Sequence, residues 1–379
     1  MIGSLMKSYN NVLKRGCRIS LRAKVNDSLI TGLRVVDSIL SVGRGQRALI
    51  LGDRYTGKTS IFLSLLITLN RLNFLVAIDG FGTQRLFGFY IGMNQNLSKL
   101  SKLISSIVID WFSLILASHS SSSSLLSFLI ALIGISIAER LRDRGFDCCI
   151  CFDDLSKHSK CYRQISLILA KIPSRDAFPV DIFNIHSSLL ERCGKLMYSY
   201  FGGSINAFPV IETINSDITE YIATNVISIT DGQFYTNKRL FLDSCRPAID
   251  SGLSVNRIGS SAQSKLMKVL SVGIKNLLTN YRIMELAELS YCSNKLLSLN
   301  ISFYQDHLLI SPIETSLILI LFFRNGFLFN SLIQIHRLLF LLSFEYLYLY
   351  YILFLFKTSY DLYLYSFFIV YIKVILTIN

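Results

Sequence analysis

One eight-residue run in the sequence combines glycines, a lysine and a threonine at a spacing suited to binding an anion. Residues 52–59 read Gly-Asp-Arg-Tyr-Thr-Gly-Lys-Thr and fit the pattern G-x-x-x-x-G-K-[ST] without a gap. In such a loop the backbone N–H groups turn inward around phosphate, and the next helix adds the positive end of its dipole. We expect Lys58 to reach the terminal phosphates and the Thr59 hydroxyl to help hold Mg²⁺. The candidate nucleotide-binding residues are Gly52, Asp53, Arg54, Tyr55, Thr56, Gly57, Lys58, Thr59 and Ser60.

A loop of this kind also needs a carboxylate at the end of a neighbouring apolar strand, where it can hold Mg²⁺ or its water shell. The apolar run Cys148–Phe152 is followed directly by Asp153 and Asp154, and Asp153 stands 95 residues after Lys58. We assign Asp153 to the metal side of the site and Asp154 to the cap of the next helix. A surface pair of aspartates that begins a helix would account for Asp154 alone.

The flanking sequence predicts the elements that position these groups. Ala48–Leu51 is predicted as a buried strand, and a helix is expected from Ser60 onward, which is the context that the motif requires. The alternative is a glycine-containing loop that binds no ligand. Between residues 36 and 175, apolar runs alternate with polar breaks, as in βα units. Further predicted strands are Phe74–Ile78, Ile107–Ile109, Cys148–Phe152 and Val226–Thr230, with a helix over Leu126–Arg142 and a helical period over residues 262–290.

The charge and the cysteine content limit the kinds of partner and the cellular compartment that suit the chain. The formal net charge is +13, and residues 1–54 carry ten Lys and Arg against three Asp. This excess suits nucleic acid, an acidic partner subunit or an anionic membrane surface, and does not choose among them. The eight cysteines show no paired CxxC spacing. Since neighbouring strand residues point to opposite faces, Cys148 and Cys149 suit a buried strand better than a metal site, and a reducing compartment is expected.

The two ends of the chain raise the question of a membrane. The N-terminal residues are basic and lack the apolar core of a secretory signal; they suit a transit peptide or a chain that simply starts here. Leu338–Phe356 and Tyr363–Ile378 are long and apolar enough to count as membrane-span candidates. Because Glu345 stands in mid-span, we favour a helical domain whose composition has drifted toward Phe, Leu, Ile and Tyr.

Several long segments, taken together and in order, resemble the alpha subunits of F-type ATP synthase. The resemblance covers roughly residues 28–290 and separates the chain from other hexameric P-loop motors and from the catalytic beta subunits. The segments that carry it are residues 43–47, 52–59, 153–157, 162–164, 186–187, 189–192, 209–213, 224–233, 246–249 and 252–260.

The resemblance implies an α/β fold. It implies a P-loop NTPase (RecA-like) nucleotide-binding domain over residues 31–280, an N-terminal linker segment over residues 1–30 and an α-helical C-terminal domain over residues 281–379. The family's N-terminal β-barrel is not matched, so a separate chain could supply it. Nothing can be matched beyond about Asn330.

The resemblance also implies a role. Family members bind ATP or ADP with Mg²⁺ without turning it over, and they alternate with beta subunits in a ring around the gamma subunit of the central stalk, beside a peripheral stalk. The apolar drift suits an organelle genome, so we expect the matrix side of the mitochondrial inner membrane, ahead of a plastid or bacterial membrane. The activity expected of the complex is ATP synthesis coupled to hydrogen-ion transport.

Three further residues receive roles only through the resemblance. Arg257 matches an arginine finger, a planar and always-charged fork that reaches the catalytic site of the neighbouring beta subunit. Without the resemblance, Arg257 would be read as part of an ordinary surface salt bridge. Arg246 and Pro247 match positions that line the pocket of the nucleotide base.

The resemblance also predicts an absence. In a hydrolysing ring a glutamate is expected at the end of the strand that follows the P-loop helix; we place that strand at Phe74–Ile78, and no glutamate follows it, which fits a non-catalytic subunit. At other positions the chain departs from the family pattern. A Gln expected near Gly80 is missing there, and Asp79 has no assigned role. Tyr55 replaces a Gln of the loop, and a Gln pair that contacts the base cannot be located after Tyr291.

Two other functions stay open at this stage. The net charge of +13 motivates an independent ring motor acting on nucleic acid, although no RNA-binding module with interleaved aromatic residues precedes the loop. Tyr55 and the missing Gln pair motivate a degenerate structural subunit that no longer binds nucleotide.

Overall fold

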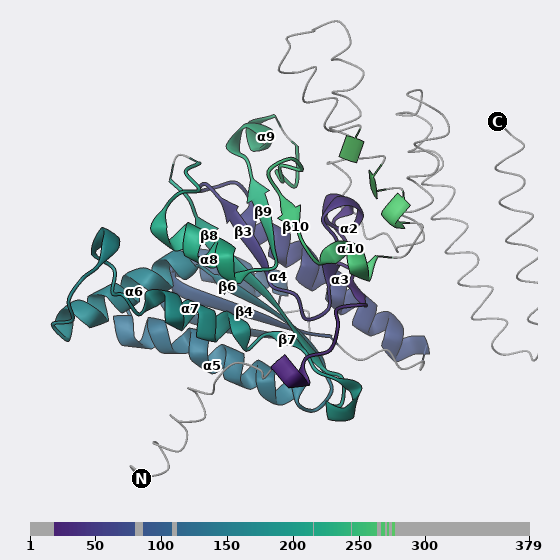
Figure 1. Ribbon diagram of the computed structural model, residues 1–379, viewed down its shortest axis with the longest axis horizontal. Coiled ribbons are helices and arrows are strands. Elements are labelled where there is room, and N and C mark those ends of the chain that lie inside the picture. The colour runs from purple at the N-terminus through teal and green to yellow at the C-terminus, as the bar shows by residue number, and fades with distance from the viewer. Residues whose placement is uncertain are drawn as a thin grey trace, which may run out of the picture. The chain divides into compact units, whose positions relative to one another are not determined.

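A mostly parallel β-sheet forms the centre of the computed structural model, which describes residues 19–79, 86–107, 112–214, 216–243 and 245–263, with short pieces between residues 267 and 276. The strand order is β10-β9-β3-β8-β6-β4-β5, and β7 pairs with β8 (Figure 1). Strands β9, β3, β8, β6, β4 and β5 run parallel, while β10 and β7 pair antiparallel with β9 and β8. The bounds are β3 Ala48–Gly52, β4 Leu86–Gln95, β5 Ser113–His119, β6 Asp147–Asp153, β7 Gly194–Lys195, β8 Ser204–Glu212, β9 Gly232–Thr236 and β10 Val255–Asn256.

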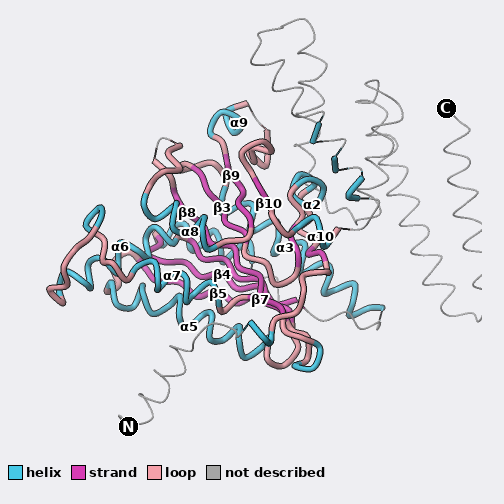
Figure 2. Tube along the Cα trace, viewed as in Figure 1, coloured by secondary structure: helices cyan, strands magenta, loops and turns pink. Residues whose placement is uncertain are grey.

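Helices cover both faces of this sheet (Figure 2). Helices α3 (Lys58–Asp79) and α4 (Leu97–Ile107) lie on one face, and α5 to α8 lie on the other. The bounds of the latter are α5 Ser124–Arg142, α6 Leu155–Ile168, α7 Ile182–Glu191 and α8 Tyr221–Ile229. The shorter elements are β1 Ser28–Leu29, α2 Arg34–Ile39, β2 Val42–Gly43, α9 Lys238–Leu242, α10 Gly259–Ala262 and the 3-10 turns Ile19–Leu21, Arg175–Ala177 and Tyr198–Tyr200.

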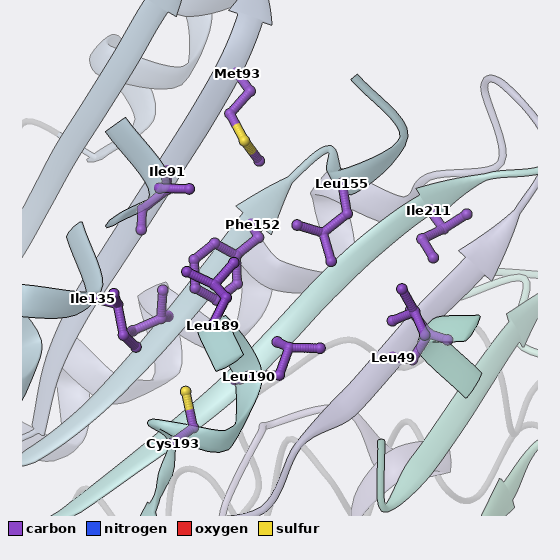
Figure 3. Close-up of a cluster of buried hydrophobic side chains, with 14 of the residues drawn as sticks. Leu49, Ile91, Met93, Ile135, Phe152, Leu155, Leu189, Leu190, Cys193 and Ile211 are labelled. Carbon is purple, nitrogen blue, oxygen red and sulfur yellow. The ribbon is translucent and has the colours of Figure 1, made fainter. Parts of the chain in front are cut away.

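Alternation along the strands divides the core into two layers, because successive strand residues face opposite sides of the sheet. Ile50 packs with Phe62 and the rest of the α3 side, whereas Leu49 packs with Leu189 and the α5–α8 side. Figure 3 shows the second layer, in which Phe152 lies among side chains from the strands and helices. Because these strands are buried on both faces, their sequences are continuous apolar runs.

The α/β class, the strands at Ala48–Leu51 and Cys148–Phe152, and the helix over Leu126–Arg142 are confirmed by the structure. Cys148 packs in one layer of the core, while Cys149 and Cys151 pack in the other. The three thiols therefore fill both faces of a buried strand.

Three predicted strands are wrong where the structure describes them. Phe74–Ile78 lies inside α3, and Ile107 is the last residue of α4, while residues 108 and 109 of the same prediction lie outside the described residues. The next described strand is β5 at Ser113–His119. Val226–Thr230 lies at the end of α8, where Ile222, Ala223 and Val226 are buried at helical spacing. Short apolar runs do not by themselves distinguish a strand from one turn of a buried helix, and this ambiguity caused all three errors.

One helix in the described part of the chain, α5, is long and apolar enough to cross a membrane. It packs against β4, β5 and β6 through buried residues that include Ala131, Leu132 and Ile135, while Leu125 and Leu126 at its start are exposed. The span candidates Leu338–Phe356 and Tyr363–Ile378 lie outside the described residues, as do most of residues 262–290 and all of residues 281–379.

Candidate nucleotide-binding site

The phosphate-binding loop connects the carboxyl end of β3 to the first residue of α3, Lys58. Gly52 has φ +155°, and a Cβ placed there would lie 1.8 Å from Oγ1 of Thr236, so no larger residue fits. Gly57 has φ +82°, in the left-handed region that favours glycine. Tyr55 has φ +62° and is 90% exposed, so the loop holds a bulky residue in a strained conformation with its ring in solvent.

Lys58 folds back over the loop. Its ammonium donates a 2.8 Å hydrogen bond to the carbonyl oxygen of Gly52 and another to that of Asp53. Burial lowers the pKa of Lys58, and the nearby carboxylates of Glu212, Asp154 and Asp153 oppose this shift. The ammonium therefore lies at the centre of the loop, held by backbone oxygens.

Asp53 ties the loop to the segment after β8. Its carboxylate accepts hydrogen bonds of 2.8 Å from the Thr213 hydroxyl and from both the backbone N–H and the hydroxyl of Ser216. Desolvation is the largest single effect and raises the pKa of Asp53, but these hydrogen bonds and the Lys58 charge together outweigh it, so the pKa lies below its ordinary value. Arg54 forms a 3.3 Å ion pair with Glu212, with the Arg54 side chain largely exposed. The side chains of Asp53 and Arg54 are thus held by the segment from Glu212 to Ser216.

Asp153 ends β6 and faces the start of α3. Its Oδ2 atom accepts a 3.2 Å hydrogen bond from the Thr59 hydroxyl, lies 3.0 Å from Nζ of Lys99, and accepts a hydrogen bond from the Tyr90 hydroxyl. The structure therefore brings together Thr59 and Asp153, the two residues assigned to the metal from the sequence. Lys99 and Tyr90 were missed, because they come from α4 and β4, and no sequence spacing links those elements to β6.

Asp154 begins α6 and serves as its cap, since Oδ1 accepts a 2.7 Å hydrogen bond from the backbone N–H of Ser156. Burial, with the Asp153 charge as the second cause, raises the pKa of Asp154 to about 7. Its Oδ2 atom is buried without a hydrogen-bond partner among the described residues. Asp154 thus has the capping place expected from the sequence.

The strand after the P-loop helix is β4, and this corrects the sequence assignment of Phe74–Ile78. It ends at Gln95, whose side-chain amide donates a 2.9 Å hydrogen bond to the backbone oxygen of Asp153. A glutamine, and not a glutamate, therefore stands where the strand meets the site. From the sequence a Gln was sought near Gly80, because the strand was placed at Phe74–Ile78; α3 runs to Asp79, and the glutamine that ends the next described strand is Gln95.

Arg246 and Pro247 follow α9 on the other side of the loop. The guanidinium carbon of Arg246 lies 5.1 Å from the ring centroid of Phe241, and a Cβ added at Gly57 would lie 3.8 Å from Cε2 of the same ring. Phe241 therefore connects Arg246 to the loop as an aromatic wall. It was missed from the sequence, where its one signal is an aromatic residue five positions before Arg246.

Arg257 lies apart from these groups. It follows β10, whose Asn256 pairs with Gly232 at the start of β9, and its backbone N–H donates to the carbonyl oxygen of Asp231 over 3.1 Å. In the same register, Ala48 pairs with Gly232 and Gly52 with Thr236, so Arg257 and the loop stand at opposite ends of the strands. The side chain is exposed and has no ion pair within the part of the chain that the structure describes.

Comparison with known proteins places this site in a family. The model of the ATP synthase alpha/beta family, nucleotide-binding domain, matches residues 32–256. A mitochondrial ATP synthase subunit alpha from Trypanosoma brucei brucei is 41% identical over 264 residues, which are 69% of this chain and 44% of that protein. A mitochondrial ATP synthase subunit alpha from Dictyostelium citrinum is 41% identical over 275 residues, which are 72% of this chain and 51% of that protein.

The similarity is not confined to mitochondrial proteins. An ATP synthase subunit alpha from Neorickettsia sennetsu is 41% identical over 282 residues, which are 73% of this chain and 54% of that protein. The chain spans about half the length of these curated relatives. The matched region contains the loop, Asp153 and Gln95. The chain therefore belongs to the ATP synthase alpha/beta family and, within it, is related to the alpha subunits of F-type ATP synthase.

Proposed function

We propose that this chain is the nucleotide-holding, non-catalytic alpha subunit of a rotary, proton-translocating ATP synthase. The observation that carries the proposal is Gln95 at the carboxyl end of β4, hydrogen-bonded to Asp153 beside an otherwise complete phosphate-binding loop. A neutral side-chain amide cannot take a proton from an attacking water, so this site lacks the general base that a glutamate would supply. We therefore expect the loop to bind phosphates and to cleave them at a negligible rate.

The phosphates of ATP or ADP would occupy the loop through its backbone N–H groups and the N-terminus of α3. Lys58 would exchange the carbonyl oxygens of Gly52 and Asp53 for phosphate oxygens, because a phosphate is the stronger acceptor for an ammonium. Phe241, Arg246 and Pro247 would flank the base. The side chain of Tyr55 points into solvent, so the cradle of backbone groups stays open.

The residues present fit a magnesium ion. Thr59 and Asp153 place hydroxyl and carboxylate oxygens within 3.2 Å of each other, and these are the ligands that Mg²⁺ prefers. When bound with nucleotide, Mg²⁺ supplies positive charge to the phosphate oxygens. The chain's own contribution is to hold Thr59 at the first turn of α3 and Asp153 at the end of β6.

Arg257 would act on a neighbouring subunit and not on the nucleotide of its own chain. Its exposed side chain stands at the opposite end of the strands from the loop, and it is unpaired among the described residues. A guanidinium in this position can meet charge that develops in a beta-subunit site. The partners proposed are therefore beta subunits in an alternating ring, the gamma subunit and the peripheral stalk.

The proposed location is the matrix side of the mitochondrial inner membrane. Two of the relatives reported above are named as mitochondrial, which supports this compartment. The function that follows is ATP synthesis coupled to hydrogen-ion transport by the whole complex.

The nucleotide site is tested by equilibrium binding of Mg-ATP to the full chain. Replacing Lys58→Gln should weaken binding at least about tenfold, because a charge-assisted contact to phosphate is lost. Lys102→Gln removes the same charge from the exposed side of α4 and serves as the matched control. Equal affinity for the Lys58→Gln and Lys102→Gln variants would contradict the proposed phosphate site.

A further inference from the structure

A cation from the chain itself occupies the metal side of the site. Nζ of Lys99 lies 3.0 Å from Oδ2 of Asp153, and the same oxygen accepts the hydroxyl hydrogens of Thr59, over 3.2 Å, and of Tyr90. Three donors from α3, α4 and β4 thus converge on one carboxylate oxygen. The ammonium stands beside Thr59, on the oxygen that would otherwise face a metal or its water shell.

Helix stability does not explain the presence of Lys99. The residue lies in the first turn of α4, where the positive end of the helix dipole disfavours a cation. Lys102, one turn later, is a more favourable place for the same charge. The pair with Asp153 offsets this disadvantage, because the Asp153 side chain is only 5% exposed and a buried carboxylate needs a partner. The Lys99 side chain is 42% exposed, so its stem reaches in from solvent.

The ammonium changes the charge that an incoming nucleotide meets. Without a cation, the Asp153 carboxylate would repel phosphate oxygens that approach Thr59. Mg²⁺ would then be needed to neutralise the carboxylate and the phosphate oxygens. With Lys99 in place, the carboxylate is already paired with a cation, and this second ammonium shares Oδ2 of Asp153 with the hydroxyl of Thr59, the residue next to Lys58. Lysine is well suited to this as a compact point charge on a flexible stem.

We propose that Lys99 is a resident cation of the nucleotide site, so that this chain retains ADP and ATP with little dependence on Mg²⁺. The inference rests on the proposed nucleotide-binding function and deepens it by naming what the site requires. Mg²⁺ can still enter, because the exposed stem of Lys99 allows the ammonium to leave Oδ2. The metal then replaces one neutralising charge with another and adds little affinity.

The test measures equilibrium binding of fluorescent ADP to the full chain, once with excess Mg²⁺ and once with EDTA. Wild-type affinity should change less than about threefold between the two conditions, since Lys99 substitutes for the metal charge. Lys99→Gln should bind nearly as wild type with Mg²⁺ and roughly tenfold or more weakly in EDTA, the loss expected for one charge-assisted contact. Lys99→Arg keeps the charge and should restore much of the EDTA binding. Lys102→Gln, with the same charge change one turn away, should behave as wild type.

The outcomes separate this inference from the proposed function. Wild-type binding that is strong with Mg²⁺ and lost in EDTA would overturn the inference and leave the nucleotide-holding role intact. A Lys99→Gln variant that weakens binding equally in both conditions would also overturn it, because the lysine would then be a general contact. Absence of wild-type binding in both conditions would overturn the proposed function and, with it, the inference. Thermal unfolding shows whether the Lys99→Gln variant folds. If it does not, the affinity of the wild type with Mg²⁺ and with EDTA decides by itself whether the inference holds.

Discussion

Single side chains decide the chemical character of this site. Gln95 removes a general base, Lys99 supplies a cation, and Tyr55 puts a bulky residue where the backbone favours glycine or asparagine. Each of these residues differs from the expectation for a hydrolysing P-loop site. In the function that we propose, Gln95 and Lys99 give the site electrostatics that favour a bound, uncleaved nucleotide.

The first prediction at the residue scale concerns Tyr55. Its φ of +62° is strained for a tyrosine, and its ring is 90% exposed, so little packing is lost on replacement. Tyr55→Asn should leave the free energy of unfolding unchanged or raise it by up to about 1 kcal/mol, because asparagine tolerates the left-handed region. Chemical denaturation measures this change.

The same variant separates a holding site from a degenerate one. If the backbone groups form the phosphate cradle, Tyr55→Asn should bind Mg-ATP within roughly threefold of wild type, since no side-chain contact is removed. Stronger binding by more than this would show that the tyrosine obstructs the loop. Absence of binding in both proteins would favour a subunit that has lost its nucleotide.

At the scale of elements, the contact between α6 and α7 contains a buried imidazole pair. Nδ1 of His158 lies 3.3 Å from Nε2 of His186, and the ring of Phe128 stacks on His158 at a centroid distance of 4.8 Å. Burial lowers the pKa of His158 to about 4 and that of His186 to about 3, the latter with help from His158. Both side chains are therefore neutral in the folded protein at neutral pH.

This pair predicts a loss of stability in acid. Below the unfolded pKa of 6.5 the unfolded chain binds protons that the folded chain excludes, so stability falls as the pH drops toward the folded values. Between pH 6.5 and pH 5 each imidazole should cost about 1.6 kcal/mol of unfolding free energy. Because the raised pKa of Asp154 contributes with the opposite sign in this range, denaturation at a series of pH values measures the total slope, and a histidine variant measures the share of the pair.

Two variants show whether the histidine pair contributes to the slope of the unfolding free energy against pH. His158→Gln should make it shallower, because one titrating group is gone, even if stability at neutral pH also falls. Phe128→Leu disturbs the same packing without removing a titrating group, so it should lower stability by a similar amount at every pH. A slope that is unchanged in His158→Gln would contradict the assignment.

The elements also show how far the sequence could predict this structure. The loop and Asp153 were predictable because local spacing and an apolar strand define them, and β3 and β6 lie where those runs are. Gln95, Tyr90 and Lys99 were not, because their place beside Asp153 depends on β4 pairing with β6 across a long sequence separation. The sequence does not show this pairing, and for the same reason Phe74–Ile78 was predicted as the strand that follows the P-loop helix.

At the scale of the whole molecule, Arg257 and the loop lie at opposite ends of the parallel strands. This arrangement suits a subunit that holds one nucleotide and contributes to the site of a neighbour. Arg257→Lys in an assembled ring should reduce turnover on the order of 10³-fold, because a lysine cannot reproduce the planar fork of an arginine finger. Steady-state ATP hydrolysis by the ring measures this loss.

The matched control is Arg144→Lys, an exposed arginine in the turn between α5 and β6, which should leave turnover unchanged. Nucleotide binding at the loop of the Arg257→Lys chain should also stay as in wild type, since the two sites are separate in this subunit. Full turnover in the Arg257→Lys ring would remove the arginine-finger assignment while leaving the nucleotide site unaffected.

The central claim is that the loop at residues 52–59 holds nucleotide without cleaving it, because Gln95 stands where a base would be needed. The most direct measurement loads the full chain with ATP labelled at the γ-phosphate and follows the label on the protein over time. We expect the label to remain on the protein as intact ATP, far beyond the fraction of a second that a catalytic site turning over at about 1–100 s⁻¹ would need. Release of labelled phosphate at such rates by the chain alone would contradict the account.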